Sequence, residues 1–286
     1  MDKRLFLYIG KHISGFGNRA LLKINEDYQQ DISLSQLQLT KYIQPKYYDT
    51  VMHQLTIALR EEKEWQEKMQ RDHFFTYDDS CYPDLLKEIY NPPVLLFYKG
   101  DLSLLKGHHL SIIGSRKACD YSLDLLDELL KELVKYYIIV SGLAYGIDAR
   151  SHQRTIYHHG KTIAVIGSGL DYYYPKEHYA LQNKIAKEHL LLSEYPAATQ
   201  PKPYYFPERN RIIAGLSEGC VVIQAAKKSG TAITAMQALE AGREVFALPS
   251  QANDLRFLGC HRLIQDGAKL ITCAEDIVSE LLHWRY

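Results

Sequence analysis

The segment Phe206–Leu216 places two guanidinium groups and an amide, at Arg209, Asn210 and Arg211, just ahead of an apolar helical run. Three aromatic residues at positions 204–206 come immediately before them. Arginine side chains hold phosphate through paired hydrogen bonds and stack on bases, and aromatic rings offer flat faces to unpaired bases. This segment therefore predicts a nucleic-acid backbone, preferably single-stranded, as the ligand.

A second loop carries side chains suited to an anion. Gly114, Ser115 and Arg116 follow an apolar run and precede a predicted helix, so that glycine allows a sharp turn, serine supplies a hydroxyl and arginine a fork. The N-terminus of a helix favours an anion, because its free backbone N–H groups and its dipole are positive there. A plain turn with a surface arginine is the alternative for this loop.

A third loop ends in Ser229, Gly230 and Thr231, directly before another predicted helix, with lysines at positions 227 and 228. Two lysines and a small-residue helix start predict a second place where an anion binds. The pattern G-x-x-x-x-G-K-[ST] is absent from the sequence, so this loop is not a P-loop.

Gly142 and Gly167 belong to two more loops that follow predicted strands. Asp148, at the end of the first, is expected to cap a helix or to make a buried hydrogen bond rather than to act as a general base. The second lacks the third glycine of a dinucleotide fingerprint, which disfavours NAD. It ends in three tyrosines, Pro175 and Lys176, which form either a stacking and phosphate-holding lip or a hinge with a solvated lysine; both interpretations stay open.

Enzymatic motifs are missing from the sequence. No nucleophile–base pair accompanies these loops, and there is no H-E-x-x-H, no G-x-S-x-G and no cluster of metal ligands. We therefore predict a protein that binds a polyanion without turning it over, without cofactor or metal. Because 34 basic residues balance 34 acidic ones, the nucleic-acid site must be a local patch.

The composition also indicates the compartment. Five scattered cysteines form no C-x-x-C pair, and an odd count without a signal peptide suits a reducing cytosol. No stretch approaches the roughly 18 apolar residues that a membrane helix needs. We expect a cytoplasmic protein with no membrane partner.

An alternation of strands and helices must position these loops. The predicted strands are Val94–Tyr98, Leu110–Ile113, Ile138–Val140, Thr162–Ile166, Leu190–Leu192, Val221–Ile223 and Val245–Leu248. Helical patterns cover Leu123–Leu133 and lie near Asp148–His158, Lys176–Lys187, Thr231–Ala241, Cys260–Asp266 and Ile277–Leu282. This order predicts an α/β fold with a doubly wound, mostly parallel sheet, in which ligands bind at the carboxyl ends of the strands.

The N-terminal part reads differently. Residues 1–72 are mostly helical and polar, and residues 73–286 are expected to form the sheet domain. The segment Ile13–Leu22 contains a glycine turn between two helices. A helix-hairpin-helix uses such a turn to hold a phosphate on backbone N–H groups, but a plain helical hairpin is favoured, because few basic residues lie nearby.

Residues from about Phe75 to Ala274 resemble the DprA/Smf family of DNA-processing proteins. The matching motifs, in order along the chain, are G-S-R at Gly114–Arg116, S-G-L-A-x-G-I-D at Ser141–Asp148, G-x-G-L-D-x-x-Y-P-K at Gly167–Lys176, S-E-Y-P at Ser193–Pro196, F-P-x-R-N-R-I-I-A-G-L-S at Phe206–Ser217, S-G-x-x-I-T-A at Ser229–Ala235, E-x-G-R-x-V-F-A at Glu240–Ala247 and L-I-x-x-G-A at Leu263–Ala268.

The resemblance implies an extended Rossmann fold with a small SAM-like helical domain at the N-terminus. It implies a protein of natural transformation that binds and protects incoming single-stranded DNA and loads a RecA-type recombinase onto it. Arg116 and Lys176 would be the main phosphate contacts, and Arg209, Asn210 and Arg211 would shape the same pocket. The family also forms homodimers, and we expect the two-fold contact around Cys260–Leu270.

The sequence departs from the family pattern at a few places. Ser250 and His261 stand where relatives usually carry glycine and asparagine; the first is expected to tighten a turn and the second to alter the dimer contact. Many relatives continue into a winged-helix domain, for which this sequence ends too early.

Two other functions compete with this interpretation. Nucleotide phosphoribohydrolases of the lysine-decarboxylase-like family share the sheet and a related glycine loop, but Thr234 stands where their catalytic glutamate would be. Without that carboxylate, hydrolysis of the N-glycosidic bond lacks its acid–base group. A duplex-DNA binder that uses the N-terminal glycine turn is the second alternative, which the zero net charge and the aromatic loops disfavour.

Overall fold

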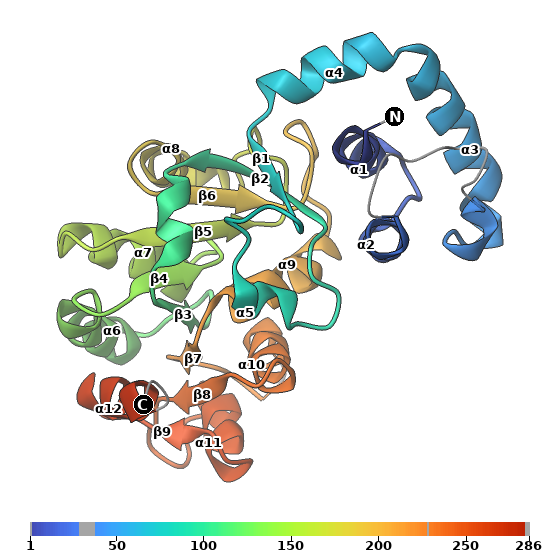
Figure 1. Cartoon of the computed structure of the whole chain (residues 1–286). Helices are drawn as coiled ribbons and strands as arrows, with labels where there is room; N and C mark the ends of the chain where they lie inside the picture. The colour runs from blue at the N-terminus through green and yellow to red at the C-terminus, as the bar shows by residue number, and fades with distance from the viewer. Residues whose placement is uncertain (1, 29–37, 228, 284–286) are drawn as a thin grey trace.

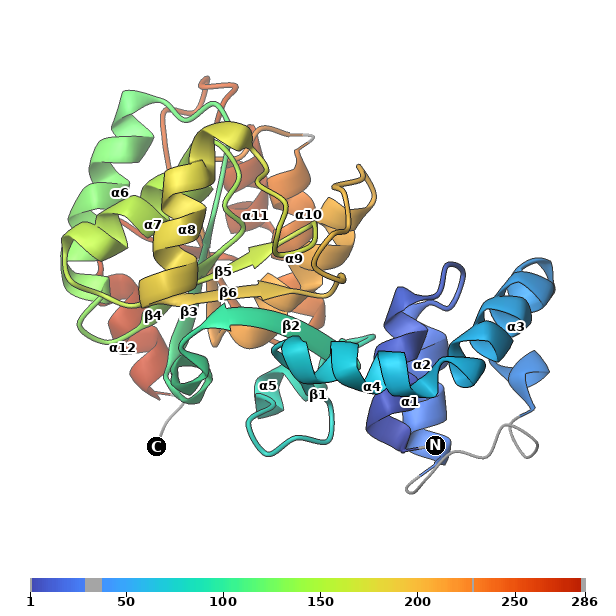
Figure 2. The ribbon, with the colours of Figure 1, turned by 90° about the horizontal axis from the view of Figure 1, so that it is seen from above.

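The computed structural model describes residues 2–28, 38–227 and 229–283, and these residues form a nine-stranded sheet in the order β1-β2-β6-β5-β4-β3-β7-β8-β9. Figures 1 and 2 show the sheet with helices packed on both of its faces. The strands are β1 (Phe74–Thr76), β2 (Leu95–Gly100), β3 (His109–Ile113), β4 (Ile138–Ser141), β5 (Thr162–Ile166), β6 (Leu190–Ser193), β7 (Gly219–Val222), β8 (Glu244–Ala247) and β9 (Lys269–Leu270).

The strands from β6 to β9 pair in parallel, whereas β1 and β2 pair antiparallel at one end. In the centre, β3 lies between β4 and β7, with Leu110 opposite both Ile139 and Gly219. Every residue of β3, β5, β6 and β7 is buried, which explains why their sequences are mostly apolar. The predicted mostly parallel, Rossmann-like α/β sheet is confirmed.

Helices cover the two faces of this sheet. In Figure 1, α6, α7 and α8 lie on one face, and α9 and α10 lie on the other. Their bounds are α5 (Asp84–Lys87), η2 (Leu102–Lys106), α6 (Asp120–Leu133), α7 (Ile147–Tyr157), η3 (Lys176–His178), α8 (Tyr179–Glu188), α9 (Tyr205–Leu216), α10 (Gly230–Glu240), α11 (Leu258–Gln265) and α12 (Glu275–His283).

The N-terminal part is helical and packs beside β1 and β2 (Figures 1 and 2). Its elements are α1 (Lys3–His12), α2 (Asn18–Asp27), η1 (Leu39–Lys41), α3 (Pro45–Arg60) and α4 (Glu62–Arg71). The ring of Tyr8 in α1 lies 5.3 Å from that of Phe74 and 6.1 Å from that of Phe97, centroid to centroid. One buried apolar cluster therefore runs from α1 into β2, so the helical part is attached to the sheet by a shared core.

Each predicted strand is present, and the predicted helices match within a few residues. The structure adds β1 and β9, edge strands of three and two residues that the sequence pattern did not reveal. The predicted division at residue 72 falls between α4 and β1. That this point separates two independent domains, and that the N-terminal one is SAM-like, stay predictions. Among the described helices, none has the length and apolar character required to cross a membrane.

Candidate nucleic-acid interface

The strand order changes direction at β3: β4, β5 and β6 are added on one side of it, and β7, β8 and β9 on the other. The crevice at the carboxyl ends of the strands at such a point is where doubly wound sheets bind ligands. A cavity of about 620 Å³, which we call the branch-point groove, opens there between the loops that follow β3 and β7. The predicted site residues that line it are Gly114, Ser115, Arg116, Arg209, Asn210, Ser229, Gly230 and Thr231.

A smaller cavity of about 40 Å³ adjoins the groove and is lined by Gly142 and Gly167. Arg116, Phe206 and Arg209 line both spaces, so the two lie side by side. The groove thus gathers four of the predicted loops at one edge of the sheet.

The loop of Gly114, Ser115 and Arg116 follows β3 but does not form the first turn of a helix as predicted, because α6 begins only at Asp120. The loop is instead held by the Ser115 side chain and by a hydrogen bond from the start of α7. The Ser115 hydroxyl accepts a hydrogen bond from the N–H of Lys117, and the Ser115 carbonyl accepts one from Ile147.

Arg116 reaches from this loop into open space. Its side chain is exposed and forms no ion pair within the described part of the chain. The guanidinium lies 5.8 Å from the ring centroid of Phe206, whose ring is 5.4 Å from that of Tyr174. A cation and two aromatic rings thus adjoin one another at the groove, which suits phosphates and bases.

Phe206 and Tyr174 lie in the two aromatic segments for which base stacking was considered from the sequence, although neither was among the residues singled out as nucleic-acid contacts. The run of three tyrosines was the available signal. Of these, Tyr174 lines the groove, whereas the Tyr173 hydroxyl donates a hydrogen bond to Asn183 of α8. The stacking interpretation therefore fits Tyr174, and Tyr173 has a structural role.

The predicted helix start after β7 is present. Ser229 is the N-cap of α10, and its hydroxyl accepts a hydrogen bond from the N–H of Ala232. Gly230 and Thr231 form the first turn beside it, and Lys227 is exposed. Lys228, the second lysine of this prediction, lies outside the described residues.

Arg209 forms the back wall of the groove and is only 4% exposed. Its guanidinium donates hydrogen bonds to the carbonyl oxygens of Gly142 and Val165, and its Nε donates to the side chain of Asn210. Burial lowers the pKa of Arg209 to about 10, against the opposing charge of Asp148. A Cβ on Gly142 would stand 2.6 Å from the guanidinium carbon, so only glycine permits this approach.

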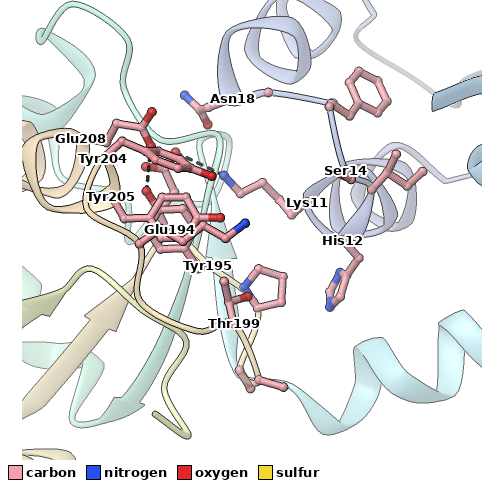
Figure 3. A pocket seen from close by; sticks show the side chains of 18 of the residues that line it. Lys11, His12, Ser14, Asn18, Glu194, Tyr195, Thr199, Tyr204, Tyr205 and Glu208 are labelled. Carbon is pink, nitrogen blue, oxygen red and sulfur yellow. Dashed lines mark hydrogen bonds and ion pairs between the residues drawn. The ribbon is translucent and has the colours of Figure 1, made fainter. Parts of the chain in front are cut away.

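Arg211 does not share this pocket, which corrects the expectation from the family motif. Residues 209–211 lie inside α9 rather than ahead of it, and successive helical side chains point about 100° apart. Arg211 therefore faces the opposite side of α9, where it pairs with Glu194 at 2.8 Å. That side belongs to a second cavity, shown in Figure 3.

Lys176 lies next to the groove without lining it. It begins η3, directly after Pro175 at the rim of the smaller cavity, and its side chain is exposed. A lysine on a flexible stem reaches several ångströms, so this position is compatible with a phosphate contact at the edge of the groove.

Two polar residues of the groove stand where an enzyme would carry an acid–base group. Asp148 is buried, and its carboxylate accepts a hydrogen bond from the N–H of Ala144, which is the structural role favoured from the sequence. Burial raises its pKa, against the opposing charges of Arg209 and Arg116. Thr234, at the position of the phosphoribohydrolase glutamate, is buried, and its hydroxyl donates to the carbonyl of Gly230.

Comparison with known proteins agrees with this geometry. The family model for DNA recombination-mediator protein A matches residues 73–282. DNA processing protein DprA of Streptococcus pneumoniae is 47% identical over 213 residues, which are 74% of this chain and 76% of that protein. DprA of Bacillus subtilis is 51% identical over 202 residues, 70% of this chain and 68% of that one.

Solved structures agree as well. The crystal structure of Streptococcus pneumoniae DprA superposes with a TM-score of 0.87 at 39% identity, covering 95% of each chain. A structure of DNA processing protein A from Helicobacter pylori, solved to explain its single-stranded DNA binding mode, gives a TM-score of 0.66 at 30% identity over 74% of this chain and 97% of that one. The chain belongs to the family of DNA recombination-mediator protein A, the DprA/Smf proteins.

Proposed function

We propose that this protein binds single-stranded DNA in the branch-point groove, without chemical turnover. One observation carries the proposal: the exposed Arg116, which forms no ion pair in the described chain, adjoins Phe206, which in turn adjoins Tyr174, at the point where the sheet branches. Guanidinium groups without an ion pair bind phosphate, and exposed aromatic rings stack on bases of any identity. The single-stranded DNA binding of the Helicobacter pylori relative supports the same ligand here.

The role in the cell follows from the ligand and the family. We propose that the protein acts in natural transformation, covers incoming single strands and loads a RecA-type recombinase onto them. The Streptococcus and Bacillus relatives named for DNA processing support this role. A cytoplasmic location is part of the proposal, since the recombinase works there.

We further propose a homodimer through the C-terminal part of the sheet. Within the predicted region, Cys260 and Leu263 are buried, so the contact must use its exposed residues, such as Leu270 on the edge strand β9. Helix α10 adds apolar side chains at three-residue spacing, and Ile233 and Met236 are about half exposed at 47% and 50%. Exposed apolar side chains and an unpaired strand edge both favour association.

The two departures from the family pattern lie at this end of the sheet and contact each other. The ring Nε2 of His261 in α11 is 3.1 Å from the carbonyl oxygen of Ser250. The imidazole therefore holds the turn after β8, which gives His261 a structural role beside the proposed contact.

The test is fluorescence anisotropy of a labelled oligo-dT over a salt series, with duplex of the same length as a comparison. We expect tight binding to the single strand that weakens as salt rises, because each phosphate contact releases counterions. Arg116→Ala/Lys176→Ala should abolish it. Lys131→Ala/Lys135→Ala is the matched control, because it removes two exposed lysines, one in α6 and one just after it, that lie outside the groove.

Equal affinity for duplex, or unchanged binding by the Arg116/Lys176 variant, would reject the groove as the site. Release of free base from a nucleoside monophosphate would instead indicate the phosphoribohydrolase. Recombinase loading is tested separately, by following filament assembly on single strands coated with single-strand-binding protein, with and without this protein.

A further inference from the structure

A second cavity, of about 960 Å³, lies between the N-terminal helices and the sheet, and no part of the proposed function uses it. Its two walls are the turn between α1 and α2 and the segment from Glu194 to Arg211. Figure 3 shows Tyr195, Tyr204 and Tyr205 on one side, and Lys11, His12 and Asn18 on the other. We call it the α1–α9 cleft.

The sheet side of the cleft is a platform of aromatic rings. Tyr195 and Tyr205 are stacked with centroids 3.9 Å apart, and Tyr204 stands edge-on to Tyr205 at 4.6 Å. The hydroxyl of Tyr195 donates to Glu208 at 2.8 Å, which fixes the platform, while Tyr204 is 55% exposed. Monomeric proteins seldom leave several adjoining rings open to a cavity unless something packs on them.

Positive charge stands beside this platform. The ammonium of Lys202 lies 5.9 Å from the ring centroid of Tyr204 and 5.6 Å from that of Tyr205. Arg19 and Lys68 also line the cleft. None of these three cations has a carboxylate partner in the part of the chain that the structure describes.

Two of the four acidic residues that line the cleft are paired with cations, and the other two, Asp72 and Glu208, accept hydrogen bonds from the hydroxyls of Tyr8 and Tyr195. Glu194 holds both Lys11 and Arg211, at 3.2 and 2.8 Å, and Asp171 is paired with Lys99 at 2.7 Å. Among the described residues, three lining cations without an ion pair thus stand against two carboxylates held only by tyrosine hydroxyls, which leaves a small positive excess next to the exposed ring of Tyr204. This combination suits phosphates and unpaired bases better than it suits a peptide.

The cleft and the branch-point groove share one wall, the N-terminal half of α9. Phe206, Pro207 and Asn210 line the groove, whereas Tyr205, Glu208 and Arg211 line the cleft. At about 100° per residue, positions 206, 207 and 210 fall on one side of the helix, and positions 205, 208 and 211 fall on the opposite side. Because a helix with its side chains is about 10–12 Å across, a strand that leaves the groove has only the first turn of α9 to cross.

We propose that the α1–α9 cleft binds the continuation of the same DNA single strand, with bases on Tyr204 and Tyr205 and a phosphate on Lys202. This inference rests on the proposed function of the groove. The N-terminal helices then form one wall of a longer binding path, instead of serving only to pack against the sheet.

The experiment compares two lengths of labelled oligo-dT, about 5 and about 15 nucleotides, with the full-length protein. The short strand fills only the groove, so Tyr204→Ala and Lys202→Ala should bind it as the wild type does. The long strand should lose about tenfold in affinity with Tyr204→Ala, the loss of one stacked base. Tyr204→Phe keeps the ring and should bind normally, and Lys202→Ala should lower the salt slope by about one.

Tyr157→Ala is the matched control, because Tyr157 is also an exposed tyrosine with a cation, Arg154, 4.2 Å from its ring, but lies outside both cavities. The affinity of the Tyr157→Ala variant for the short and the long oligo-dT should equal that of the wild type. Thermal melting of each variant confirms that the protein is folded.

The outcomes separate this inference from the function on which it rests. If wild type binds neither strand, the proposed function fails. If wild type binds and Arg116→Ala does not, but Tyr204→Ala and Lys202→Ala bind the long strand normally, only the cleft is rejected. Equal losses on both lengths would place Tyr204 in the groove, and a loss of recombinase loading alone would make the cleft a protein site; both results contradict the inference.

Discussion

Arg209 should support the structure of the groove rather than hold DNA, and replacing it tests this directly. In Arg209→Met the apolar stem is kept, but the buried carbonyls of Gly142 and Val165 lose their donor. Each buried acceptor left without a partner costs about 1–3 kcal/mol, so two cost about 4 kcal/mol together. Asp148 also loses the positive charge that opposes its burial.

The expected result is a large fall in thermal stability. In a chain of this size, 1 kcal/mol corresponds to about 2–4 °C in Tm, so Arg209→Met should melt roughly 8–16 °C below wild type. The assay is calorimetry or circular dichroism, followed by oligo-dT binding at a temperature where both proteins are folded. Adding Asp148→Asn should recover part of the loss, because the unpaired buried carboxylate is then removed.

Arg116→Met is the matched control, since it removes the same group from an exposed position without an ion pair in the described structure. Its Tm should stay within the change that about 0.5 kcal/mol produces, while its DNA affinity falls. The reasoning would be refuted if Arg209→Met melted with the wild type and lost only DNA binding. Arg209 would then be a ligand contact, and its hydrogen bonds to the two carbonyls would not contribute to stability.

Three further predictions concern charge and association. Arg116→Ala should reduce the slope of log affinity against log salt by about one, measured by anisotropy; an unchanged slope would exclude a phosphate contact. Leu270→Asp or Met236→Asp should convert a dimer to a monomer in light scattering after gel filtration, and a dimer that persists would place the contact elsewhere. Burial opposes ionisation of Glu194, but the charges of Arg211 and Lys11 outweigh it and hold its pKa below the ordinary value. The ionised group therefore stabilises the fold above about pH 4.3, its value in the unfolded chain, and this stability is lost as pH falls below it. Tm should fall less steeply on acidification in Glu194→Gln than in wild type, and parallel curves would contradict the assignment.

The strands were predictable because each carries a short, mostly apolar run, as expected for a strand buried on both faces. β1 and β9 escaped detection because two or three residues give no pattern, and only their neighbours in the sheet define them. The start of α9 was placed too late, since the polar residues 209–211 interrupt the apolar signal. This error in the start of α9 led to the wrong assignment of Arg211 to the groove, because adjacent side chains of a helix point in different directions.

The groove was predictable as a set of loops, because the carboxyl ends of parallel strands meet at one edge. The sequence did not reveal which of the side chains in these loops are exposed and available to a ligand. Arg209 and Arg116 look alike in the sequence, and only the fold shows that one is buried against carbonyls and the other exposed. The pairing of Glu194 with Lys11 joins residues far apart in the chain, and no local pattern indicates such a contact.

The ionic group of Lys11, Glu194 and Arg211 has a consequence for how the family can diversify. Glu194 is 4% exposed and depends on a cation supplied by the N-terminal helices. A chimera that joins these sheet strands to another helical segment leaves that buried carboxylate with one cation instead of two, which is costly. The residues at positions 11, 194 and 211 should therefore change together among relatives, and the helical segment should be inherited with its sheet rather than exchanged as a module.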